Sequence, residues 1–101
     1  MSFSWDPKKD EANRRKHGVS FQEAAELLRG DSDYLEIYDE EHSHNEDRFI
    51  AIGPIRRGVI VVVFTERDDD VVRIISARMA AAAERRRFEE SKRGRDGRRD
   101  S

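Results

Sequence analysis

The residues of this chain that are best suited to chemistry are arginines placed in strand-like sequence. Arg73 and Arg78 stand in the stretch VVRIISARM, among valine and isoleucine. Burying an unpaired guanidinium is costly, so each needs a carboxylate, a carbonyl or an anionic ligand nearby. A structural ion pair and a phosphate-binding site satisfy this need equally well. Arg48 and Arg67 lie in or beside two other predicted strands, and their paired donors also match phosphate oxygens.

Side chains in a strand alternate between its two faces, which predicts where these groups point. On this pattern Val72, Ile74, Ser76 and Arg78 share one face, and Arg73 lies on the other face with residues 71, 75 and 77. The two arginines would then flank an apolar strip.

Groups that could transfer protons stand at the ends of predicted elements. Lys16 and His17 end a polar helix, and Glu46 begins a strand. His17 is equally suited to cap helix carbonyls, and Glu46 with Arg48 fits a same-face ion pair of a strand equally well. Ser76 is predicted to satisfy the end of its strand rather than to act as a nucleophile, because no Ser-His-Asp pattern is visible.

His42 and His44 stand two apart in the acidic loop DEEHSHN. This composition invites a metal-binding interpretation. Two histidines without a spaced set of further ligands do not define a closed coordination geometry. We therefore predict neither a metal nor a cofactor.

Length and composition limit the class of protein. The 101 residues suffice for one domain, and 36% hydrophobic against 42% charged residues predict a small core under an ionic surface. The absence of cysteine excludes disulfides and thiolate chemistry. The longest apolar run, 59–64, is too short to cross a membrane, and the N-terminus lacks a signal core. We expect a cytoplasmic protein that does not engage membranes.

Charge is unevenly distributed along the chain. Residues 31–47 carry many carboxylates and no lysine or arginine, whereas residues 85–99 are rich in arginine. A basic segment favours a polyanionic partner such as nucleic acid, and an acidic one can pair with basic groups of the chain or of a partner. We predict a single domain over 1–90 and a disordered basic tail over 91–101, which lacks residues to bury.

The sequence predicts an α+β fold with an antiparallel sheet of four to five strands, two N-terminal helices and one C-terminal helix. Asp6-Pro7 and Gly18 delimit the first helix, and Ser20 and Gly30 delimit the second. A polar turn at 31–33 follows, and 53–58 reads as a hairpin connection. The predicted strands are 3–5, 34–38, 46–52, 59–64 and 71–77, and the last helix spans about 78–90.

Several short blocks are spaced along the whole chain. In order, they are Trp5-Asp6-Pro7, Asn13, the run KHGVSF from Lys16, Glu46 with Arg48, Gly53, Arg67, the run RIISAR from Arg73, and 84–89. Together these blocks resemble the BrnT family of type II toxins. The resemblance implies a fold like that of RelE-type ribonucleases and an RNA-cleaving activity that arrests growth. It also implies a cognate DNA-binding antitoxin that neutralises the toxin and, together with it, represses their operon.

Two positions depart from the family pattern. Met79 follows the SAR block where a lysine or another polar residue is expected, and Phe88 stands where relatives often have tyrosine. Phe88 cannot exchange a proton, so we predict that it only packs.

Cleaving RNA without a metal requires a base for the 2′-hydroxyl, cations for the phosphorane and an acid for the leaving 5′-oxygen. We predict a metal-independent endoribonuclease whose partners are RNA and the antitoxin, with operator DNA bound only through the antitoxin. The predicted catalytic residues are Lys16, His17, Glu46, Arg48, Arg67, Arg73 and Arg78, and the predicted RNA-binding residues are Asn13, Ser76, Arg85 and Arg86.

Two alternatives remain from the residues alone. The chain could be a non-catalytic module whose acidic and basic segments form a docking surface for a protein. It could also bind RNA without cutting it, in which case affinity falls steeply with salt while the RNA stays intact.

Overall fold

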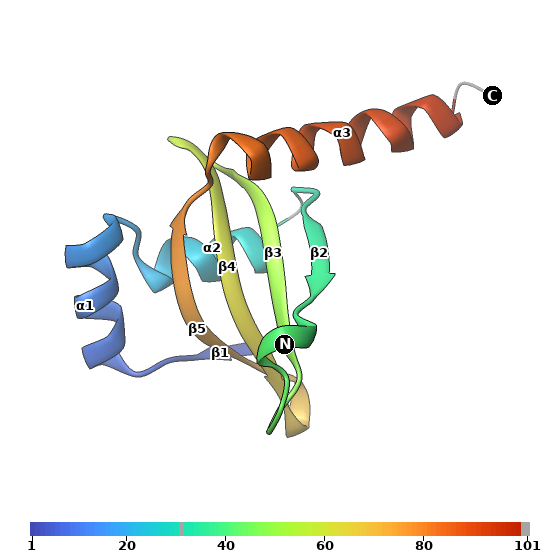
Figure 1. The fold of residues 1–101 in the computed structure, drawn as a ribbon. Helices are drawn as coiled ribbons and strands as arrows, with labels where there is room; N and C mark the ends of the chain where they lie inside the picture. Colours follow the sequence, from blue (N-terminus) through green and yellow to red (C-terminus); the bar gives the residue numbers. More distant parts are fainter. Residues whose placement is uncertain (31, 100–101) are drawn as a thin grey trace.

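Three helices surround a five-stranded sheet in the computed structural model (Figure 1). The elements are β1 (Ser2–Ser4), α1 (Pro7–His17), α2 (Phe21–Arg29), β2 (Leu35–Tyr38), β3 (Arg48–Ile55), β4 (Gly58–Arg67), β5 (Val71–Met79) and α3 (Ala82–Arg99), with short 3-10 turns η1 (Glu40–His42) and η2 (Asp68–Asp70). The structure describes residues 1–30 and 32–99, without the side chains of residues 69 and 94–99. Residue 31 of a predicted turn therefore lies outside the described residues.

The sheet has the order β1-β5-β4-β3-β2. Strands β2 to β5 form the predicted antiparallel meander, and β4 takes the central place. The opening strand β1 pairs in parallel with β5, which makes the sheet mixed. The predicted α+β class is confirmed, with this one parallel pair added.

Both N-terminal helices begin and end at the predicted capping residues. Asp6 accepts a hydrogen bond from a backbone N–H of α1 at 2.9 Å, and Gly18 ends the helix in the left-handed conformation at φ 71°. Ser20 and Glu23 form a complete capping box at the start of α2. Local sequence thus fixes where the two helices stop and start.

One face of the sheet, which we call the covered face, packs against α2, which Figure 1 shows behind the strands. The α2 residues Phe21, Ala24 and Ala25 are fully buried there. Burying apolar area in this layer supplies the main stabilisation of the fold. The covered face consists of Ala51, Ile60, Val62, Phe64, Val72, Ile74 and Ala77.

The opposite face of the sheet is covered only at one end. Phe88 of α3 is 3% exposed and packs there with Ile52 and Val61. This burial confirms that Phe88 has a packing role. Met79, the other departure from the family pattern, is 38% exposed.

The hairpin between β3 and β4 is shorter than predicted. Strand β3 continues through Gly53 and Pro54, and only residues 56–57 form the turn. Gly53 is needed for packing, because a Cβ there would lie 2.7 Å from Tyr34 Cβ and 2.9 Å from Leu27 Cδ1. Pro54 is tolerated because β2 does not extend to it, so no second strand needs its missing N–H.

Strand β5 contains a β-bulge that the predicted alternation lacks. The adjacent β4 residues 63 and 64 pair with 76 and 74, so Ile75 is an extra residue. Beyond the bulge, Ser76 and Arg78 change sides and lie on the same face as Arg73. The predicted face of Ser76 and Arg78 is therefore wrong, because a strict two-residue period cannot anticipate an inserted residue.

The last helix starts later and ends later than predicted. Pairing of β5 with β4 extends to Met79, so Arg78 belongs to the strand and α3 begins at Ala82. Residues 91–99, which we predicted to be part of a disordered tail, are helical, and their arginines and lysine are good helix formers. Residues 100–101 of that predicted tail lie outside the described residues. None of the described helices is long and apolar enough to span a membrane.

Candidate active site

The sheet face turned away from α2 forms a hollow between α3 at one end and η1 at the other. In Figure 1, η1 lies in front of the strands and α3 crosses their far end. We call this surface the open face and define it by the strand residues Arg48, Ile50, Val63, Ser76 and Arg78. Its hollow measures about 310 Å³ and is also lined by Asp39, His42, Val61, Ile75 and Glu84.

Two smaller hollows adjoin the open face on either side. One of about 300 Å³ lies toward α1 and shares Ile75 and Ser76 with it. Another of about 260 Å³ contains Glu46 and shares His42 and Arg48 with it. Because they share lining residues, the three hollows form one continuous band across the sheet, from α1 to the loop that follows β2.

Arg48 is the most unusual cation in this band. It is half-buried, and its Nε is inaccessible to solvent and has no hydrogen-bond partner among the described residues. Thr65, its partner in the β3–β4 register, is 1% exposed and its Oγ1 also lacks a partner there. Buried polar groups are nearly always hydrogen-bonded, so Arg48, whose side chain lines the hollow, is a cation whose hydrogen bonds the described residues do not complete.

Arg78 is held in a bidentate ion pair with Glu84 at the start of α3. Its Nη1 and Nη2 donate to the two carboxylate oxygens at 2.7 Å each. The Arg78 hydrogen bonds, with an N–H from Ala81, lower the pKa of Glu84 from the usual 4.5 to about 2, although burial opposes them. The same pairing raises the pKa of Arg78. Through this ion pair, Glu84 links the start of α3 to Arg78 on the open face.

The loop after β2 places a second polar pair on the open face. His42 Nδ1 lies 2.9 Å from Asp39 Oδ2. The Asp39 side chain is only 13% exposed, whereas the His42 ring is 62% exposed. A shielded carboxylate therefore orients an imidazole that stays accessible.

The α1 side of the band holds Lys16 and His17, which line the hollow that contains Ser76. Asn13 lies beside them, and its side-chain amide is hydrogen-bonded to backbone groups of the fold. Its Nδ2 donates to the carbonyls of Val19 and Ala77 at 2.8 and 2.7 Å, and its Oδ1 accepts from the Ala77 N–H at 3.2 Å. The amide therefore makes the two hydrogen bonds to Ala77 that a neighbouring strand would otherwise make.

The structure separates the remaining predicted residues from the central hollow. Arg67 forms an ion pair with Glu46 at 3.3 Å and both side chains are more than a third exposed. Arg73 shares the face of Arg48 through register, but its Nη1 contacts Ser4 Oγ at 3.5 Å beyond the hollow. Arg85 and Arg86 are exposed on α3.

Sequence reasoning did not select Asp39, Thr65 and Glu84, which the structure brings to the site. Glu84 carried a signal, since a glutamate in the first turn of a helix commonly accepts from the backbone, as it does here from Ala81 at 2.8 Å. Asp39 and Thr65 have no signal in a single sequence. Within the described residues, no group of three or more potential metal-ligating side chains comes together.

Comparisons with known proteins identify the family and the fold of the chain. The family model described as the ribonuclease toxin BrnT of type II toxin-antitoxin systems matches residues 5–84. The crystal structure of the Brucella abortus ribonuclease toxin BrnT superposes with a TM-score of 0.59 at 25% identity, covering 80% of this chain and 97% of that one. A comparison with curated proteins found no match.

Proposed function

The chain belongs to the BrnT family of ribonuclease toxins of type II toxin-antitoxin systems, and from this premise we propose that it cuts RNA on the open face without a metal ion. The Arg48 guanidinium, which lines the hollow and whose Nε has no partner among the described residues, is the observation that carries the proposal. A phosphodiester oxygen in the hollow would accept from a guanidinium placed there, and two more polar groups, Ser76 and Arg78, line the same hollow.

The proposed reaction is attack of the ribose 2′-oxygen on the adjacent phosphorus. Arg48 and Arg78 bind the phosphate and stabilise its added negative charge, because preorganised donors act strongly where water is partly excluded. Ser76 donates to a phosphate oxygen between them. This chemistry needs only positioned donors, a base and an acid, all of which protein side chains supply.

Proton transfer comes from the two ends of the band. Lys16 and His17 stand at the α1 end, next to Ser76, and Glu46 stands at the loop end, next to Arg48. Lys16 suits the acid, because an ammonium group is a donor without acceptor capacity. The exposed Arg85 and Arg86 contribute long-range attraction for the RNA backbone.

The test is RNA cleavage by the purified chain, free of host nucleases and of any partner, in excess chelator. We expect cleavage that leaves 2′,3′-cyclic phosphate and 5′-hydroxyl ends, since the 2′-oxygen is the attacking group. Tight binding of intact RNA, or neither binding nor cutting by folded protein, would favour a non-catalytic module instead.

Growth arrest and its control follow from the family. We propose that a cognate DNA-binding antitoxin covers the open face, and that acidic side chains of the antitoxin contact the cations there. The toxin would then reach operator DNA only through the antitoxin, and the pair would repress their operon in the cytoplasm. Co-expression of the antitoxin should restore growth and RNA integrity, and its failure to bind the chain would contradict this part.

A further inference from the structure

We propose that His42, oriented by Asp39, is the general base of the cleavage reaction, an inference that rests on the proposed ribonuclease function. His42 lines both the central hollow and the one beside it, and Arg48 is the other residue common to the two. The imidazole therefore stands next to the guanidinium whose buried Nε lacks a partner among the described residues.

The loop that carries His42 is built onto the first residue of β3. The Asp39 N–H donates to the carbonyl of Arg48 at 2.9 Å, and Ser43 Oγ donates to the Asp39 carbonyl at 2.6 Å. The Arg48 N–H in turn donates to Ser43 Oγ at 2.9 Å. These three hydrogen bonds tie the loop to Arg48 and thereby hold the backbone that carries His42 beside it.

The pairing with Asp39 determines which ring nitrogen is available. Asp39 Oδ2 accepts from Nδ1–H at 2.9 Å, so the neutral ring keeps its lone pair on Nε2, away from the carboxylate. A carboxylate behind an imidazole also stabilises the imidazolium that forms when the ring takes a proton. With 62% of the His42 side chain exposed, Nε2 remains open to a bound nucleotide.

The proposed step balances without any further reactant. Nε2 of His42 takes the 2′-hydroxyl proton, and the freed electron pair of the 2′-oxygen forms a bond to phosphorus. The bond from phosphorus to the 5′-oxygen breaks, its electron pair stays on that oxygen, and Lys16 supplies a proton to it. The products are a 2′,3′-cyclic phosphate and a 5′-hydroxyl, and water later reverses the two protonation states.

The other candidate bases are less suited by their surroundings. Glu46 is engaged by Arg67 at 3.3 Å, so its carboxylate already has a partner. Lys16 carries an ammonium group, which donates hydrogen bonds and accepts none, and it therefore suits the acid. His17 lies on α1, on the far side of Ser76 from Arg48.

His42→Ala should lower the single-turnover rate of RNA cleavage by about 100-fold or more, the usual contribution of a general base. Added imidazole should restore part of the rate, because it can enter the space left by the ring. The matched control is Glu41→Ala, which removes an exposed side chain beside His42 that is not among the residues lining the three hollows, and it should keep the rate within about two-fold.

Asp39→Asn tests the positioning role separately. It should lower kcat by about ten-fold or more with little change in KM, since the ring loses its orientation but the phosphate ligands stay. The cleavage rate of the parent should show the rising pH limb of a reaction that uses a general base, and His42→Ala should lose this limb. The charged and titratable groups that face His42 are Asp39, Arg48, Arg78, Glu84, His44 and Glu46, and none of them is altered in His42→Ala.

The outcomes separate this inference from the function on which it rests. A parent that cuts RNA while His42→Ala cuts equally fast would overturn the inference and leave the ribonuclease function intact. A slow, folded His42→Ala that imidazole does not rescue and that keeps the pH limb would make His42 structural, which also overturns it. A folded parent that cuts no RNA would overturn the proposed function itself.

Discussion

The same strands form both faces of the sheet, but the two faces have different roles. The covered face is apolar and packs against α2, whereas the open face carries arginine and serine among isoleucine and valine beneath a partial cover. In β5 the two meet at the bulge at Ile75, which turns Ser76 and Arg78 away from the core and toward Arg48. Substitutions on the covered face should therefore change stability, and those on the open face should change activity.

The largest effect is expected from Phe21→Ala on the covered side. Phe21 is fully buried and meets Trp5 edge to face at 6.3 Å between ring centroids. Truncation should lower the free energy of unfolding by about 3–5 kcal/mol, most of the stability of a small domain. Urea unfolding measures it, with the exposed Gln22→Ala as control. A loss below about 1 kcal/mol would mean that this layer is not the core.

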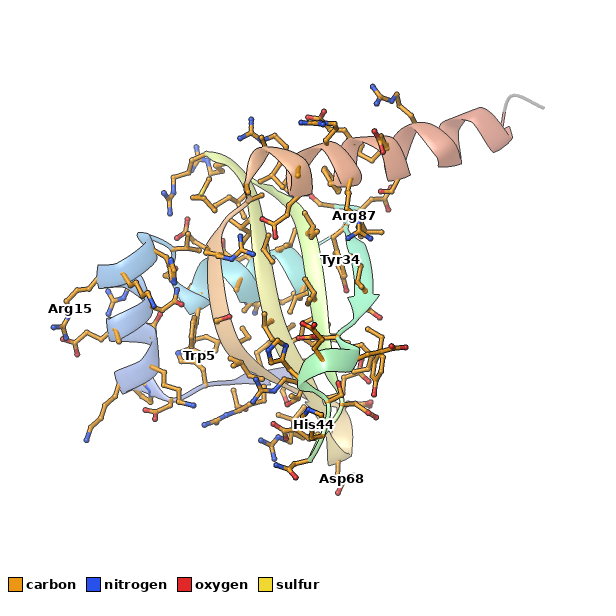
Figure 2. The ribbon with its side chains drawn as sticks, viewed as in Figure 1. Trp5, Arg15, Tyr34, His44, Asp68 and Arg87 are labelled. Atoms are coloured by element: carbon orange, nitrogen blue, oxygen red, sulfur yellow. The ribbon has the colours of Figure 1, made fainter. Side chains whose placement is uncertain are left out.

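Arg78→Ala should produce the opposite behaviour on the open face. Losing a donor to the developing phosphorane charge should slow cleavage about 100- to 1,000-fold while the circular dichroism spectrum stays unchanged. Lys16→Ala should likewise abolish growth arrest and still bind antitoxin. Arg15→Ala is the control, because its side chain is 75% exposed and points away from the sheet (Figure 2). Unfolding of both variants would show that these residues are structural.

Asn13→Ala tests a residue that lies between the two faces. Its amide bonds the carbonyl and the N–H of Ala77 and the carbonyl of Val19, so truncation removes the partner of three buried backbone groups. We expect a loss of about 2–3 kcal/mol in the free energy of unfolding. Glu11→Ala, at an exposed position of the same helix, should change it little. A stable Asn13→Ala that has lost RNA affinity would instead support the RNA-binding role predicted from the sequence.

Glu84→Gln should have the smallest effect. Glutamine can still accept from Ala81 but loses the charge that pairs with Arg78. The pKa of Glu84 is lowered in the folded protein. The ion pair therefore stabilises the fold at pH values above the usual pKa of 4.5, and this stabilisation is lost as the pH falls toward about 2. We expect a difference of roughly 1 kcal/mol at pH 7, since both groups are partly exposed. Urea unfolding of parent and variant across this pH range should show that the difference in the free energy of unfolding disappears. A difference that stays constant with pH would contradict the stabilising role of the pair.

Local signals in the sequence were sufficient for much of the fold. The caps at Asp6, Gly18, Ser20 and Gly30 and the alternating strands predicted the helices and the meander, since these depend on near neighbours. Gly53 and Pro54 were misread as a turn, because glycine is also required where two elements approach closely.

The site was predictable in its residue types and not in its arrangement. Arg48, Ser76 and Arg78 were selected from the sequence and line one hollow. The pairing of Asp39 with His42 depends on the fold of a loop, and the burial of Thr65 depends on how β3 and β5 pair on either side of β4. The bulge that brings Arg78 to this face leaves no pattern in a single sequence.

The most direct test of the open face as the toxic site is induced expression of the chain beside its Arg48→Ala variant, with growth and RNA integrity followed over time. Arg56→Ala, in the exposed turn between β3 and β4, is the matched control. We predict arrest with RNA loss for the parent and the control, and normal growth with intact RNA for Arg48→Ala at equal soluble level. Equal arrest by Arg48→Ala, or normal growth of cells that contain folded parent, would contradict the account.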